Sequence, residues 1–127
     1  MSLTEEDVKE GKGFAIVPRG IQRMPWYGKS ATIVWLHLRL NARYKPDILA
    51  GVELKEGEWL GSIQQICNAT GLTVKTVRHA VDLLKEDGEI KARVVDSDLG
   101  KRTVFTLCSW ACMKQKEKGQ PVLPLAK

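Results

Sequence analysis

Cationic and hydroxyl side chains gather in one short segment of the chain, from Thr73 to His79. Lysine and arginine donate hydrogen bonds to guanine edges and to phosphates, and threonine can bond to either group. The sequence shows neither a recognisable Ser-His-Asp catalytic triad nor a pair of carboxylates that would indicate catalysis. The segment therefore predicts contact with double-stranded DNA, and we expect neither enzyme activity nor a cofactor.

An apolar stripe decides which side of this segment faces outward. Thr73 is a suitable N-cap for a helix that Gly88 ends. Four aliphatic side chains follow at i, i+3, i+7 and i+10 and are expected to point inward: Val74, Val77, Val81 and Leu84. The DNA-binding residues expected on this helix are then Thr73, Lys75, Thr76 and His79, with Arg78 at the edge of the groove.

A shorter helix is predicted just before this one. Ser62 is its expected N-cap, the helix runs from Ile63 to about Ala69, and Gly71 ends it. Two short helices joined by a turn of three or four residues with a glycine form a helix-turn-helix unit. In that unit the second helix enters the DNA major groove, which is about 12 Å wide.

Two β-prone segments follow the helices, residues 90–95 and residues 103–108, and residues 96–102 connect them with turn-forming Asp, Ser and Gly. We expect these segments to form a β-hairpin with a charged tip, placed as a wing beside the DNA backbone. The basic side chains of this hairpin expected to contact DNA are Lys91, Arg93, Lys101 and Arg102.

The first half of the chain is predicted to supply a largely buried helix. Ser30 is its expected N-cap, and the helix extends from Ala31 to Tyr44, before Pro46. Residues 45–57 are expected to form a loop with one short turn, followed by a short strand over residues 57–62. The predicted fold class is α+β, a winged helix-turn-helix with a three-helix core, a short strand and a C-terminal hairpin wing.

The predicted domain covers residues 14–112, between a flexible arm (1–13) and a flexible tail (113–127). Among the 127 residues, Lys and Arg exceed Asp and Glu to give a net charge of +5, which fits a nucleic-acid partner. No run of 18 apolar residues predicts a membrane span. The chain has three cysteines, an odd number whose spacing does not suggest a set of disulfides. We therefore expect reduced thiols, a cytoplasmic location and no metal site.

Gly28-Lys29-Ser30 resembles the end of a phosphate-binding loop. That motif requires a glycine five positions before Gly28, and Arg23 stands there instead. We therefore interpret Lys29 and Ser30 as residues that cap a helix.

The order of motifs between residues 51 and 90 resembles a known family. A Gly-initiated strand and a Ser cap lead to Thr70-Gly71-Leu72, a helix containing Val-Arg, and a closing Leu-x-x-x-Gly-Glu-Ile. This pattern is similar to the winged-helix domain of phage and prophage replication initiators, often called replisome organisers, over roughly residues 14–112. The resemblance implies origin binding in DNA replication and recruitment of helicase-loading or other replication proteins.

Two other functions remain open at this point. A transcription regulator of the same fold would carry the same residues, and some winged-helix domains dock proteins without binding DNA. Because one winged helix reads only a few base pairs, a homodimer or an array of sites is compatible with either DNA-binding role.

Overall fold

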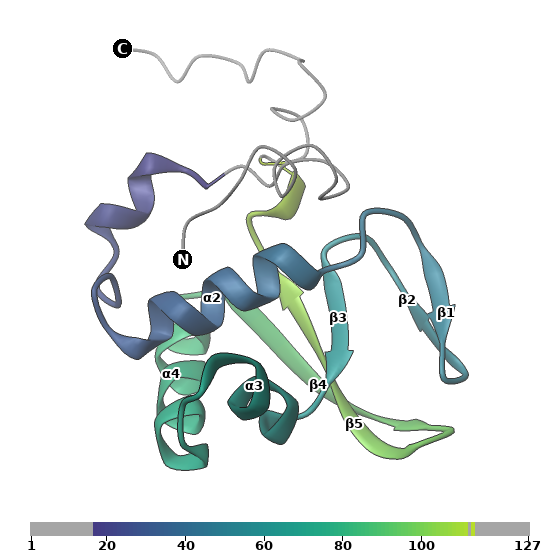
Figure 1. Cartoon of the computed structure of the whole chain (residues 1–127). Helices are drawn as coiled ribbons and strands as arrows, with labels where there is room; N and C mark the ends of the chain where they lie inside the picture. The colour runs from purple at the N-terminus through teal and green to yellow at the C-terminus, as the bar shows by residue number, and fades with distance from the viewer. Residues whose placement is uncertain (1–16, 112, 114–127) are drawn as a thin grey trace, which may run out of the picture.

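The computed structural model describes residues 17–111 and Met113, so the predicted arm and all of the predicted tail except Met113 lie outside the described residues. The described part is a mixed α+β structure with two small antiparallel sheets (Figure 1). In chain order its main elements are η1 (Arg19–Arg23), α2 (Ser30–Asn41), β1 (Asp47–Leu49), β2 (Val52–Leu54), β3 (Glu58–Gly61), α3 (Ile63–Thr70), α4 (Val74–Glu86), β4 (Ile90–Ser97) and β5 (Gly100–Leu107).

Local signals set the bounds of α3 and α4 as predicted. Ser62 Oγ accepts a hydrogen bond from the Gln65 amide at 3.2 Å, and Thr73 Oγ1 accepts from the Thr76 amide at the same distance. Gly71 ends α3 with a positive φ of 78°, a conformation that glycine adopts at little cost. Both predicted caps and the turn between the helices are confirmed.

The start and end of α2 differ from the prediction. Ser30 is the first residue of the helix rather than its cap, and Lys29 occupies the cap position without a side-chain hydrogen bond. Thr32 supports the first turn instead, because its hydroxyl accepts from the Gly28 amide at 3.0 Å. The helix ends at Asn41, since the Arg43 amide donates to the Glu58 carbonyl at 2.9 Å and joins the chain to β3.

The inward side of α4 is largely as predicted, with one error. Val77, Val81 and Leu84 are buried, and Ala80 is buried beside them. Val74 was expected inward but is 39% exposed. It is the first residue of the helix, at the margin of the buried side.

The larger sheet has the strand order β3-β5-β4, with both pairs antiparallel. Pairing of β4 with β5 continues to Ser97 and Gly100, so the predicted 96–102 connection is wrong and only Asp98 and Leu99 join the strands. Backbone pairing continued through the charged residues near the tip because solvent-exposed side chains do not prevent a ladder from forming. One face of this sheet packs against α2, α3 and α4 through side chains that include Trp59 and Phe105.

A second hairpin, β1–β2, replaces the loop predicted for residues 45–57. Its two-residue turn has positive φ at both positions, 49° at Ala50 and 77° at Gly51. Such turns match the twist of paired strands but usually contain Asn-Gly or Asp-Gly, so Ala-Gly gave no signal. Val52 and Leu54 of β2 pack with Leu60 and Val104 on the sheet face away from the helices.

Candidate nucleic-acid interface

The outward side of α4 carries the basic residues that the sequence singled out. Lys75, Arg78 and His79 are exposed, and Thr76 is half-buried. Thr73 is also exposed, but its hydroxyl accepts from the Thr76 amide and donates to Thr76 Oγ1 at 2.8 Å. Lysine, arginine and histidine are therefore the groups with donors available to a partner on this side.

Charge is divided along the outward side of α4. Lys75, Arg78 and His79 occupy its first half, whereas the second half exposes Asp82 and Glu86 beside a single lysine, Lys85. With a rise of about 1.5 Å per residue, Glu86 lies about 16 Å along the axis from Lys75. A polyanion would therefore be attracted more strongly to the N-terminal half of α4 than to its C-terminal half, where two carboxylates face one lysine.

Two further acidic residues follow the end of α4. Asp87 accepts a hydrogen bond from the indole Nε1 of Trp26 at 2.9 Å, which ties this end to the segment before α2. Burial raises the pKa of Glu89, and the neighbouring Asp87 carboxylate raises it further. The hydrogen bond to Trp26 therefore fixes the acidic end of α4 against the segment before α2.

A hollow of about 520 Å³ beside α4 brings together residues from distant parts of the sequence. Lys29 and Ser30, at the start of α2, line it together with Lys75, Thr76 and His79. The sequence indicates only a helix-capping role for Lys29, because no spacing of residues relates Lys29 to α4. Packing of α2 on α4 makes Lys29 a second lysine at the hollow, beside Lys75.

A second hollow, of about 300 Å³, lies between α4 and the β4–β5 hairpin. Arg78, Asp82 and Lys85 line one side, and Val94 and Thr103 line the other. Arg78 therefore lies on the side of α4 that faces the hairpin, and the structure brings these two predicted DNA-contacting elements together.

The structure separates the two basic residues near the tip of β5. Side chains alternate along a strand, so Lys101 lies on the same face as Thr103 and Phe105, toward the helices. Arg102 lies on the opposite face with Val104, and its Nη1 donates to the Lys101 carbonyl at 2.9 Å. Lys101 Nζ is 3.9 Å from Asp96 Oδ1, and both side chains are highly exposed, so this pair is weak.

Lys91 and Arg93 are not brought to the outward side of α4. They lie on the face of β4 that points away from the helices, because Ile90, Ala92 and Val94 occupy the other face. Arg93 also borders the hollow beside Arg78, but its Nη2 is 3.5 Å from both carboxylate oxygens of Glu58.

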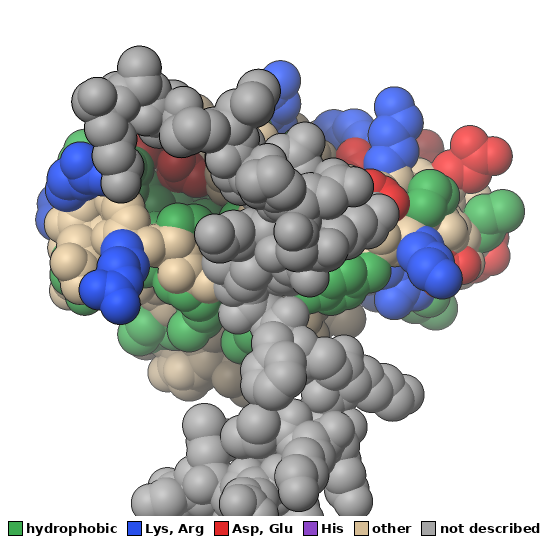
Figure 2. All heavy atoms as spheres, turned by 90° about the horizontal axis from the view of Figure 1, so that it is seen from above, with side chains coloured by type: hydrophobic (Ala, Val, Ile, Leu, Met, Phe, Trp, Pro, Cys, Tyr) green, Lys and Arg blue, Asp and Glu red, His purple; other side chains and the backbone are tan. Residues whose placement is uncertain are grey.

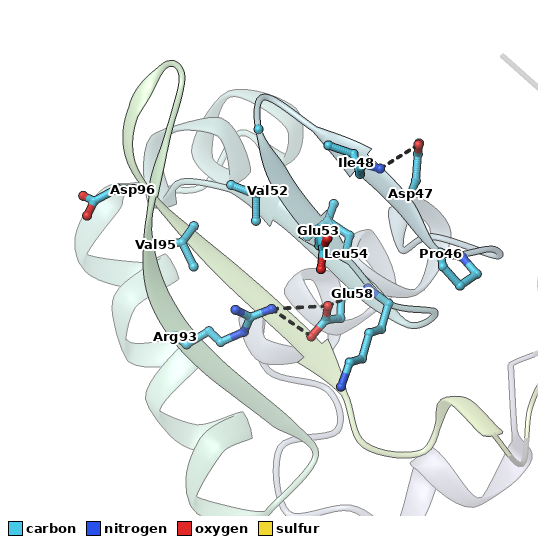
Figure 3. Close-up of a pocket in the computed structure, with 12 residues that line it drawn as sticks. Pro46, Asp47, Ile48, Val52, Glu53, Leu54, Glu58, Arg93, Val95 and Asp96 are labelled. Carbon is cyan, nitrogen blue, oxygen red and sulfur yellow. Dashed lines mark hydrogen bonds and ion pairs between the residues drawn. The ribbon is translucent and has the colours of Figure 1, made fainter.

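Glu58 anchors a buried polar network on that face (Figure 3). Its carboxylate, in a residue only 6% exposed, accepts from the Lys55 amide at 2.7 Å and from Thr106 Oγ1 at 3.1 Å. A buried carboxylate needs such partners to offset its lost hydration. The Arg93 guanidinium therefore has a structural partner, which sets it apart from Lys75 and Arg78.

Basic side chains do not gather on every side of the molecule. On the face shown in Figure 2, viewed from above α2, blue and red side chains are spread around the margin of the coloured surface. They form no single patch of one sign in the part of this face that is open to view.

Within residues 17–111 and Met113, no three His, Cys, Asp or Glu side chains lie close enough to hold a metal ion. Cys67 is buried and Cys108 is exposed, and both are free thiols. None of the helices among these residues is long and apolar enough to cross a membrane.

Comparisons of the chain with protein-family models, curated proteins and solved structures gave no significant match.

Proposed function

We propose that the chain is a winged helix-turn-helix domain that binds double-stranded DNA through the outward side of α4. One observation carries the proposal: Lys75, Arg78 and His79 are exposed together on the second of two helices joined by a three-residue turn. An α-helix fits the major groove, and cations on its outward side can donate to base edges and phosphates.

The topology supports this assignment. α2, β3, α3, α4, β4 and β5 follow one another with β3 paired to β5, which is the element order expected of a winged helix. The β4–β5 hairpin would be the wing, and its position beside Arg78 would place Lys101 near the DNA backbone. The β1–β2 hairpin is an addition between α2 and β3.

The biological role that we propose is that of a phage-type replication initiator in the cytoplasm. The resemblance of residues 51–90 to replisome organisers supports it, and helicase-loading or replication proteins would then be further partners. A transcription regulator would use the same DNA-binding surface. One observation favours a protein-docking module that does not contact DNA: α2 exposes the apolar side chains Ile33, Leu36 and Leu40. The same apolar side chains would also suit the interface of a homodimer.

Fluorescence anisotropy of the full chain on labelled random duplex DNA at two salt concentrations tests the proposal. If Lys29, Lys75, Arg78 and Lys101 neutralise about four phosphates, the slope of log K against log salt should be about −4. The double variant K75A/R78A should bind at least about tenfold more weakly, since each well-placed contact is worth about 1–3 kcal/mol. Its slope should be flatter by about two.

The double variant K45A/K55A is the matched control. It removes the same charge from exposed lysines at the base of the β1–β2 hairpin, so it should leave affinity nearly unchanged. Equal losses in the two variants would show that net charge, rather than the outward side of α4, determines binding. An unchanged affinity in K75A/R78A would refute the proposed interface.

A further inference from the structure

The outer part of the β4–β5 hairpin extends beyond the strand that pairs with its base. β3 pairs with β5 only from Thr103 to Thr106, whereas the β4–β5 ladder continues to Ser97 and Gly100. An isolated two-stranded ribbon is marginally stable in water. The segment that carries Lys101 therefore requires support from another element.

The β1–β2 hairpin supplies that support through an apolar contact. Val52 and Leu54 of β2 are buried against Leu60 and Val104, and Val95 of β4 packs at the margin of the same cluster. Figure 1 shows both hairpins extending from the same side of the molecule, away from the helices. In Figure 3, Val52 and Val95 lie on facing strands across the groove between the hairpins.

The tips of the two hairpins are joined by a backbone hydrogen bond. The Asp98 amide donates to the Ala50 carbonyl at 2.8 Å. Ala50 has a φ of 49°, in the left-handed region that alanine rarely adopts. At Gly51 an added Cβ would lie 2.8 Å from Asp98 Oδ1, so the two turns are in close contact. Strained backbone persists where surrounding structure holds it, and here it forms the junction with the other hairpin.

We propose that the β1–β2 hairpin is a brace that fixes the β4–β5 tip relative to α4, with Ala50 and Asp98 as positioning residues. The brace sets where Lys101 lies with respect to Arg78. Its effect on DNA affinity rests on the proposed function, whereas its effect on the hairpin itself does not.

The first test uses the full chain without DNA. Asp98 is the first of two residues between the paired Ser97 and Gly100, a position where common turns accept proline, and an extended residue precedes it. The D98P variant removes the donor amide, whereas D98A keeps the amide and removes the same carboxylate. NMR relaxation should show greater mobility at Lys101 in D98P than in D98A, and the Asp98 amide of the wild type should exchange slowly with solvent. Fast exchange of that amide, or equal mobility in both variants, would overturn the brace.

The second test measures DNA affinity by anisotropy. D98P should bind about three- to tenfold more weakly than D98A, because a mobile tip holds its phosphate contacts less well. In the K101A/R102A background the difference between D98P and D98A should disappear, since the groups that the brace positions are absent. A difference of the same size in both backgrounds would refute positioning through the tip. If the wild type does not bind DNA, the proposed function fails, while the NMR test still decides whether the brace exists.

Discussion

Truncation of Leu84 tests the orientation of α4, on which the direction of its basic residues depends. Leu84 is fully buried, and L84A removes three carbons from the core. At about 0.8 kcal/mol per buried methylene the transfer term is about 2.4 kcal/mol, and the cavity left behind brings the expected loss to about 2–5 kcal/mol. A domain of this size has a total stability of about 5–15 kcal/mol, so L84A should remove a large part of it.

V74A on the same helix is the matched control. Val74 is 39% exposed, so losing two carbons should cost about 1 kcal/mol, and the higher helix propensity of alanine returns about half of that. Urea unfolding followed by circular dichroism gives both values, with equal m-values showing that the denatured state is unchanged. A loss below about 1 kcal/mol in L84A, or losses of equal size in both variants, would show that the buried side of α4 has been misassigned.

Three further predictions concern the wing, the pH response and a close contact. K101A/R102A should flatten the salt slope of DNA binding by about one unit, because Lys101 is the phosphate contact expected from the wing, and an unchanged slope would remove the wing from the interface. Burial lowers the pKa of His37, so as pH falls through about 6.5 the unfolded state takes up a proton that the folded state resists. The free energy of unfolding should therefore decrease as the pH falls from about 6.5 to the lowered pKa of His37. The decrease should be smaller in H37Q, and wild-type and H37Q stabilities that fall in parallel with pH would contradict this prediction. G61A should destabilise the fold, because a Cβ at Gly61 would overlap the Trp59 ring, and a thermal melt unchanged from wild type would contradict that contact.

Features with a local physical cause were predictable from the sequence. In the caps of α3 and α4, a serine or threonine hydroxyl accepts a hydrogen bond from the backbone amide three residues later. Gly71 ends α3 because it adopts a left-handed backbone conformation. The inward side of α4 follows from helical periodicity, which failed only at Val74. These signals lie within one helix or one turn of the residue concerned.

Features set by distant partners were not predictable. The early end of α2 depends on the bond from Arg43 to the Glu58 carbonyl, and the β1–β2 hairpin depends on an Ala-Gly turn that carries no usual turn signature. Lys29 joins the candidate site only because α2 packs on α4. Arg93 has the residue type expected of a DNA contact, yet a carboxylate from another strand holds it.

The charge order along α4 opposes the helix macrodipole. Lys75 lies in the first turn, where partial positive charge accumulates, while Glu86 and Asp87 lie at the C-terminal end, where it is negative. Each such placement costs about 0.3–1 kcal/mol when exposed, and Lys85 offsets only part of it. The free domain should therefore become more stable as moderate salt screens these charges, and an anion near the first turn should relieve the same strain.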